Sequence, residues 1–237
     1  VQAFDLDRVE HECGVPADEV RRAALALGTA ERALVAWTMG VNHSVQGTET
    51  VTLLNTLCVL TGNVGRPGAA PFAITGQCNA MGPREAGFTA SMPGYRPYDD
   101  AAARRELAVL WGIGEERLPS ERGRAYPDII NGVIDGRIKG LWIIATNPVV
   151  SFPNRELLEH ALGQLDLLVV QDGFETPTSA LADVVLPAAI WGEKDGTYTN
   201  SERRVSRVRA AVEPPGEARS DFAIVMGLAE HLGVRDE

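Results

Sequence analysis

Leu141-Trp142-Ile143-Ile144-Ala145 is a short apolar run, and the chain becomes polar directly after it at Thr146-Asn147-Pro148. A second apolar run, Leu167-Leu168-Val169-Val170, leads in the same way into Gln171-Asp172-Gly173. Both runs are continuous rather than alternating, which is typical of parallel strands covered by helices on both faces. They therefore predict two buried parallel strands that end in polar loops.

The residues between and after these runs predict helices. Asn154 is a residue type that caps helices, and apolar residues recur at helical spacing through residue 162. A further helix is expected from Thr176-Pro177 to about residue 182, and the crossover between the strands should be right-handed. The pattern predicts an α/β fold with a parallel sheet, built from Rossmann-like three-layer units.

The N-terminal part of the chain repeats this pattern. A third apolar run, Ala33-Leu34-Val35-Ala36-Trp37, predicts another covered strand. Helices are expected over residues 16–27 and 50–60, on either side of it. Near the other end of the chain, Ser220 is expected to cap a last helix.

Two long segments look irregular. Residues 66–125 are rich in proline and glycine, and a long irregular stretch inside a compact protein is usually functional or disordered. Residues 187–219 look extended, with little regular structure. We therefore expect an α/β lobe over residues 1–70, a loop-rich segment over 71–125 and a Rossmann-like lobe over 126–237.

The composition narrows the class of protein. Hydrophobic residues make up 45% of the 237 residues, which is enough for a core, and the net charge of −10 argues against nucleic acid and anionic membranes as partners. No apolar run reaches the roughly 18–20 residues of a membrane span. Cys13, Cys58 and Cys78 are an odd, widely spaced set, which favours the cytoplasm. Because the sequence begins at Val1, we expect an internal piece of a longer protein.

Polar residues follow all three predicted strands. The strands lead into Thr38-Met39-Gly40-Val41-Asn42-His43, Thr146-Asn147-Pro148 and Gln171-Asp172-Gly173-Phe174. Ligands of open parallel sheets bind beyond the carboxyl ends of the strands, so we expect these segments to converge at one edge. Asp172 suits a ribose diol or a guanine edge, and its alternative role is to cap a turn or a helix.

Two charged residues extend the hypothesis of a nucleotide site. Lys194 follows the apolar residues 184–191 and suits a phosphate group as a point charge. Asp221 begins the last predicted helix, where the helix dipole favours a carboxylate, and its functional alternative is an acid that faces a purine. The glycine-rich Gly62-Asn63-Val64-Gly65 is a weak dinucleotide motif because it follows a helix rather than a strand.

Residues 75–87 form a loop-like stretch with amide side chains, glycines and one arginine. Glycines let a backbone approach a ligand closely, and the guanidinium of Arg84 suits a planar oxyanion. The alternative for Arg84 is a surface salt bridge with Glu85.

In their order and spacing these segments resemble the molybdopterin oxidoreductases that carry two molybdopterin guanine dinucleotides. The resemblance covers nearly the whole chain and implies the fold of formate dehydrogenase and DMSO reductase, domains 1–3. The matching segments are Trp37 to Asn42, Leu60 to Gly68, Gly76 to Gly87, Thr146 to Pro148, Val170 to Asp172, Ala182 to Ala188, Glu193 to Arg204 and Pro215 to Asp221.

Within that superfamily, the loop with Gln77 and Arg84 and the segment Asn200-Ser201-Glu202-Arg203-Arg204 resemble nitrate reductases of the assimilatory branch. The resemblance implies a parent enzyme that reduces nitrate to nitrite at a molybdenum centre. Formate dehydrogenases share the fold but usually lack that arginine, and a formate dehydrogenase-like enzyme is the alternative. A third hypothesis is a non-catalytic nucleotide-binding module.

The resemblance also implies roles for single residues. Gln77 and Arg84 would lie near the metal and the path of nitrate, although the sequence departs from the family at His43 and Cys78. The cofactor would be a molybdenum bis(molybdopterin guanine dinucleotide), and the ligands of the molybdenum and of a 4Fe–4S cluster would lie upstream. We therefore expect the chain alone not to reduce nitrate. The implied cofactor contacts are Met39, His43, Asn147, Gln171, Asp172, Lys194 and Asp221.

Overall fold

The computed structural model describes residues 4–74 and 76–234. The chain divides into two compact units, Val1–Cys78 and Asn79–Glu237. Each unit is a mixture of helices and strands, and parallel strand pairs occur in both, so the predicted α/β class is confirmed. The finer division of the chain at residues 70 and 125 stays a prediction.

The first unit is built around a parallel pair of strands, β1 (Leu34–Trp37) and β2 (Ala70–Ala73). β1 confirms the strand predicted from the apolar run, but alternate residues along it are exposed, so it is not covered on both faces within this unit. β2 lies in a segment that was expected to be irregular. The helices of this unit are α1 (Leu6–Cys13), α2 (Ala17–Thr29), α3 (Met39–Asn42) and α4 (Gly47–Leu60).

Helix α4 starts three residues before the predicted position, at Gly47, where the chain is tightly packed. A Cβ atom on Gly47 would lie 2.7 Å from the carbonyl oxygen of Asn42 and 2.9 Å from that of Val41, so only glycine fits here. This close approach joins α4 to the short helix α3, which begins at Met39.

Asn63 joins the end of α4 to the start of β1. It is completely buried, its Oδ1 accepts a hydrogen bond from the backbone N–H of Ala33 at 2.9 Å, and its Nδ2 donates to Oγ1 of Thr61 at 2.9 Å. Asn63, in the glycine-rich segment 62–65, therefore connects the end of α4 to the start of β1.

The second unit contains the predicted β–α–β unit. The parallel strands β3 (Gly140–Ile144), β4 (Leu167–Asp172) and β5 (Val184–Pro187) form one sheet in the order β3-β4-β5. Ile144 is paired with Gln171, and Asp172 with Pro187, so the carboxyl ends of the three strands meet at one edge.

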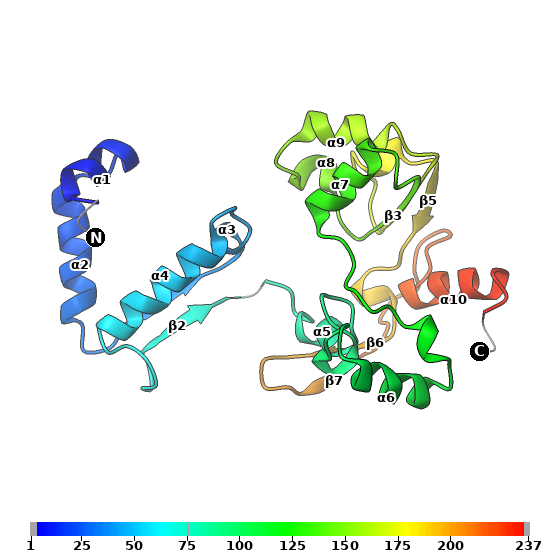
Figure 1. Ribbon diagram of the computed structural model, residues 1–237, viewed down its shortest axis with the longest axis horizontal. Coiled ribbons are helices and arrows are strands. Elements are labelled where there is room, and N and C mark those ends of the chain that lie inside the picture. Colours follow the sequence, from blue (N-terminus) through cyan, green and yellow to red (C-terminus); the bar gives the residue numbers. More distant parts are fainter. Residues whose placement is uncertain (1–3, 75, 235–237) are drawn as a thin grey trace. The chain divides into compact units, whose positions relative to one another are not determined.

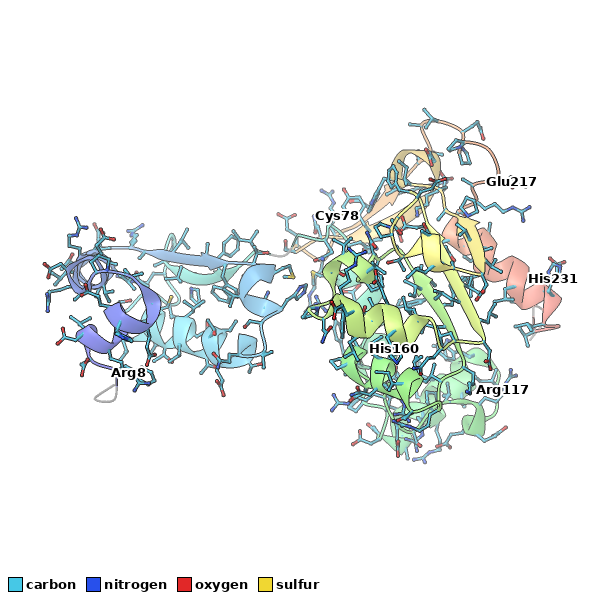
Figure 2. All side chains as sticks on the ribbon, turned by 90° about the horizontal axis from the view of Figure 1, so that it is seen from above. Arg8, Cys78, Arg117, His160, Glu217 and His231 are labelled. Atoms are coloured by element: carbon cyan, nitrogen blue, oxygen red, sulfur yellow. The ribbon has the colours of Figure 1, made fainter. Side chains whose placement is uncertain are left out.

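Helices α7 (Tyr126–Ile134), α8 (Pro148–Ser151) and α9 (Arg155–Leu162) are grouped beside this sheet (Figure 1). Oδ1 of Asn154 accepts a hydrogen bond from the backbone N–H of Leu157 at 3.0 Å, which confirms the predicted cap of α9. α9 exposes His160, labelled in Figure 2, and buries its other face. The core consists of Ile130, Val133, Ile143, Val149, Leu158, Ala161, Leu162, Leu168 and Val170.

The expectation of an irregular stretch over residues 66–125 is wrong for much of its length. Asp100 caps an 11-residue helix, α6 (Ala101–Trp111), and Gly112 ends that helix at a φ of 67°. The prolines that suggested a loop lie outside α6, and its residues Ala103 and Leu107 pack with Met92 in a second small core. The other short helices here are α5 (Met81–Glu85), η1 (Pro93–Tyr95) and η2 (Glu115–Arg117).

Residues 187–219 are also more regular than expected, because they contain an antiparallel hairpin of β6 (Gly196–Thr199) and β7 (Val205–Val208). Conversely, the helix expected over 176–182 is only a single turn, η3 (Ser179–Leu181). A further turn, η4 (Trp191–Glu193), precedes the hairpin. Ser220 caps the last helix, α10 (Asp221–His231), as predicted, and its far end is labelled at His231 in Figure 2.

Candidate cofactor-binding site at the carboxyl edge of the sheet

The backbone turns sharply where β3 ends. The N–H of Ala145 still donates to the carbonyl oxygen of Gln171 at 2.8 Å, but Ala145 has a φ of 53°. This left-handed conformation costs a non-glycine residue roughly 1–3 kcal/mol, and such strain is concentrated at functional sites. The turn directs the chain out of the sheet and into the segment that carries Asn147.

Helix α10 is brought to the same edge by the strand β5. The backbone N–H of Arg219 donates to the carbonyl oxygen of Pro187 at 3.1 Å, and the N–H of Ala189 donates to the carbonyl oxygen of Arg219 at 2.8 Å. The first residue of α10, Asp221, therefore lies beside the ends of the strands.

Three of the predicted cofactor residues meet there. Nε2 of Gln171, a completely buried residue at the end of β4, donates to Oδ1 of Asp221 at 2.7 Å. Nζ of Lys194 donates to Oδ2 of the same carboxylate and forms an ion pair with it. Both oxygens of Asp221 are thus engaged, and the helix N-terminus favours the negative charge that they carry.

The amide of Gln171 is only half satisfied. Its Oε1 is buried and has no hydrogen-bond partner among the residues that the structure describes. A buried polar atom without a partner costs about 1–3 kcal/mol, so such atoms are uncommon in folded proteins. The network therefore contains one buried acceptor that no described residue satisfies.

The ionisation of Asp221 follows from its neighbours. Burial raises the pKa of this carboxyl group, but the hydrogen bonds from Lys194 and Gln171 and the charge of Lys194 outweigh burial, and the pKa lies below its ordinary value of 3.8. Asp221 is therefore ionised at neutral pH.

A lowered folded-state pKa predicts a pH dependence of stability. The contribution of Asp221 to the free energy of unfolding is fully present above the unfolded-state pKa near 3.8, and it is lost as the pH falls through the folded-state value. We expect Asp221→Asn to reduce the acid-induced loss of stability. The measurement is urea unfolding of both proteins from pH 6 to the acid limit of folding. A constant difference between their unfolding free energies across that range would contradict the assignment.

Asn147 is held by a second group of hydrogen bonds. Its Oδ1 accepts from Oγ1 of Thr178 at 2.7 Å, and that Oγ1 accepts from the backbone N–H of Val149 at 3.1 Å. Thr178 is completely buried. Thr178 is a site residue that the sequence analysis missed, because it lies 31 residues from Asn147 and only the fold brings them together.

Asp172 adopts the more ordinary of its two predicted roles. Its Oδ1 accepts a hydrogen bond from the backbone N–H of Phe174 at 3.2 Å, which closes the turn after β4. The side chain is half-buried at the same edge as Gln171. A contact between Asp172 and a ligand stays a prediction.

Arg84 lies in the last turn of the short helix α5 and is exposed. Over residues 4–74 and 76–234 no ion pair with Glu85, and no other partner for its guanidinium, is found, so the predicted salt bridge does not form there. Asn79 anchors this segment, because its Oδ1 accepts from the backbone N–H of Thr199 in β6 at 2.9 Å. Gln77 is exposed and belongs to the other unit.

Met39 and His43 do not share a sheet with the other candidates. They follow β1, which pairs with β2 in the first unit, whereas Asn147 and Asp172 follow strands of the second unit. The expectation that all three strand ends form one sheet edge is therefore wrong. Apolar runs alone do not reveal which strands pair, because pairing depends on the long connections between them. Met39 is half-buried and His43 is exposed.

The described part of the chain contains no cluster of three or more His, Cys, Asp or Glu side chains that could hold a metal ion. The polar groups at the sheet edge suit an organic anion that both donates and accepts hydrogen bonds. They are a carboxylate, an ammonium group, a buried amide oxygen and a fixed asparagine amide. These groups fit a nucleotide, whose base and ribose donate hydrogen bonds and whose phosphates accept them. Within the described residues, no helix is long and apolar enough to cross a membrane.

A comparison with known families identifies the family of this chain. The molybdopterin oxidoreductase family model matches residues 23–231, so the chain belongs to the molybdopterin oxidoreductase family.

Individual relatives include both enzyme types considered from the sequence. The chain is 42% identical to a nitrate reductase of Synechocystis sp., over 100% of this chain and 34% of the relative. It is also 42% identical to an F420-dependent formate dehydrogenase subunit alpha of Methanocaldococcus jannaschii, over 95% of this chain and 33% of the relative. The chain thus spans about a third of the length of these curated relatives.

A solved structure has the same fold. Acetylene hydratase from Pelobacter acetylenicus matches with a TM-score of 0.65 at 22% sequence identity, and the match covers 99% of this chain and 35% of that protein. The similarity confirms the predicted fold.

Proposed function

We propose that the chain is the part of a nitrate-reducing molybdenum enzyme whose β3-β4-β5 sheet edge binds one guanine dinucleotide arm of the cofactor. The observation that carries this proposal is the network of Gln171, Asp221 and Lys194, which leaves a buried acceptor unpaired at the carboxyl edge of a parallel sheet. Ligands of such sheets bind at that edge.

Each side chain suits one portion of a guanine nucleotide. The carboxylate of Asp221 accepts hydrogen bonds from the base or the ribose, and the buried Oε1 of Gln171 accepts one more. Lys194 supplies positive charge for the phosphates, although its ion pair with Asp221 offsets part of that charge. The half-buried Asp172 remains available to the ribose.

When bound, the molybdenum cofactor would supply the two-electron oxygen-atom transfer from nitrate. The protein binds the cofactor, orients it and tunes it through hydrogen bonds. Arg84 is exposed and carries a guanidinium with no described partner, so it is suited to attract nitrate and to donate two parallel hydrogen bonds to it. We propose that Arg84 orients the substrate, and a role for Gln77, which belongs to the other unit, remains a prediction.

A formate dehydrogenase-like activity is the second candidate, because a formate dehydrogenase subunit is as similar to this chain as a nitrate reductase is. Arg84 favours nitrate, since the formate branch usually lacks an arginine in this loop. A 4Fe–4S cluster and a cytoplasmic location remain predictions.

One experiment on the full-length protein tests the proposal. The same preparation is assayed for nitrate reduction with reduced viologen and for formate oxidation with oxidised viologen. An acid hydrolysate of the preparation is then analysed for nucleotides. We expect nitrite formation, no formate oxidation and GMP in the hydrolysate. Formate oxidation alone would select the second candidate. GMP without either activity would select a nucleotide-binding module. The 237-residue chain by itself should not reduce nitrate.

A further inference from the structure

We propose that Thr178 is a positioning residue that fixes the amide of Asn147 so that its Nδ2 group donates to the phosphates of the bound nucleotide. This inference rests on the proposed function and assigns a role to a residue outside the predicted site. Thr178 lies in the turn that begins η3, and Asn147 lies just beyond the strained end of β3.

The hydrogen bonds determine which way the amide faces. Oγ1 of Thr178 already accepts the backbone N–H of Val149 at 3.1 Å, so its own proton must be donated elsewhere. Within the described chain, its only acceptor is the side chain of Asn147, at 2.7 Å. A buried hydroxyl proton without an acceptor would be costly, so the oxygen of Asn147, not its nitrogen, faces Thr178.

This arrangement leaves the donor end of the amide for a ligand. Among the described residues, Nδ2 of Asn147 has no hydrogen-bond acceptor. Asn147 follows β3 at the same edge where Gln171, the penultimate residue of β4, contacts Asp221. A fixed N–H donor at this edge suits the oxygens of a diphosphate, and it would add a neutral contact to the charge of Lys194.

The surroundings of Asn147 make the orientation rigid. Thr178 and Val149 are each at most 2% exposed, and Pro148 between Asn147 and Val149 is buried. Pro148 fixes its own φ and disfavours the helical region for the residue before it, and Asn147 lies outside that region at φ −117° and ψ 75°. The side chain of Asn147 is therefore held by its backbone on one side and by Thr178 on the other.

The test uses Thr178→Val, which keeps the shape of the side chain but removes the hydroxyl group, and Thr178→Ser, which keeps the hydroxyl group. GDP is the probe, and its Kd for the full chain is measured by calorimetry, with ADP as the comparison. We expect Thr178→Val to weaken GDP binding about tenfold, the value of about one net hydrogen bond, and Thr178→Ser to restore most of it.

A neighbouring serine provides the structural control. Ser179 lies in the same turn, is buried, and both donates to and accepts from the backbone of Thr176. Ser179→Ala should destabilise the turn without altering the affinity for GDP, because Ser179 does not contact Asn147. Equal loss of GDP binding in Ser179→Ala and Thr178→Val would overturn the positioning role.

Nuclear magnetic resonance of the same chain provides a readout that needs no ligand. The two amide protons of an asparagine side chain are always separate because rotation about the C–N bond is slow, so the readout is their chemical shifts. The 1H and 15N shifts of the Asn147 side-chain amide should be similar in the wild type and in Thr178→Ser, and should move towards those of a free asparagine side chain in Thr178→Val. Unchanged signals in Thr178→Val would refute the inference. Failure of the wild type to bind GDP would refute the proposed nucleotide site and the phosphate role of Asn147 with it. If Thr178→Val bound GDP as tightly as the wild type does, only the positioning role of Thr178 would be refuted.

Discussion

Asp221→Ala is expected to weaken GDP binding to the chain about 100-fold, because it removes a charged acceptor that is worth about 1.5–3 kcal/mol when it is hydrogen-bonded. It also leaves the buried Nε2 of Gln171 and the ammonium of Lys194 without their shared partner. The full-length protein carrying Asp221→Ala should contain correspondingly less GMP after acid hydrolysis. Calorimetry and nucleotide analysis measure the two effects separately.

Two variants separate the carboxylate of Asp221 from negative charge in general. Asp221→Asn keeps an acceptor for Gln171 but loses the ion pair with Lys194, so it should fall between wild type and Asp221→Ala. Asp195→Ala removes an exposed acid directly after Lys194. The carboxylate of Asp195 accepts a hydrogen bond from the backbone N–H of Ala210 at 2.8 Å. If Asp195→Ala weakened GDP binding as much as Asp221→Ala, the effect would be one of overall charge and the assignment of Asp221 would be wrong.

Arg84→Ala in the full-length protein is expected to raise the KM for nitrate at least about tenfold. The guanidinium is exposed and unpaired among the described side chains, so its loss leaves nothing in α5 to bind an oxyanion. A charge-assisted hydrogen bond contributes about 1.5–3 kcal/mol, which corresponds to about 10–100-fold in affinity. Steady-state kinetics of nitrite formation measure the change.

The shape of the arginine matters as well as its charge. Arg84→Lys keeps the charge but not the planar pair of donors, so it should recover only part of the lost affinity. Arg105→Ala is the matched control, since Arg105 is an exposed arginine on α6 in the same unit and also has no described partner. Unchanged KM and turnover in Arg84→Ala would rule out a role for Arg84 in nitrate binding. If Arg105→Ala raised the KM for nitrate equally, Arg84 would act only by long-range electrostatic attraction of the anion.

Local signals predicted much of the fold correctly. The apolar runs that became β1, β3 and β4 were recognised because strands of parallel sheets are apolar along their whole length. Asn154 and Ser220 were recognised as caps because their side-chain oxygens reach backbone N–H groups only three residues away. Helix α6 was missed, because prolines and glycines flank it closely and obscure its own helical pattern.

Amino-acid sequence by itself determined the strands β1, β3 and β4, the caps of α9 and α10, and the polar residues that follow the three strands, since these features depend on near neighbours in the chain. The tertiary structure alone decided which of those residues meet. Gln171 and Asp221 are 50 residues apart, and Lys194 and Asp221 are 27 apart. Their convergence depends on the order β3-β4-β5 and on the backbone pairing that places α10 beside β5. Burial of the Gln171 amide, which leaves its Oε1 without a partner among the described residues, likewise exists only in the folded chain.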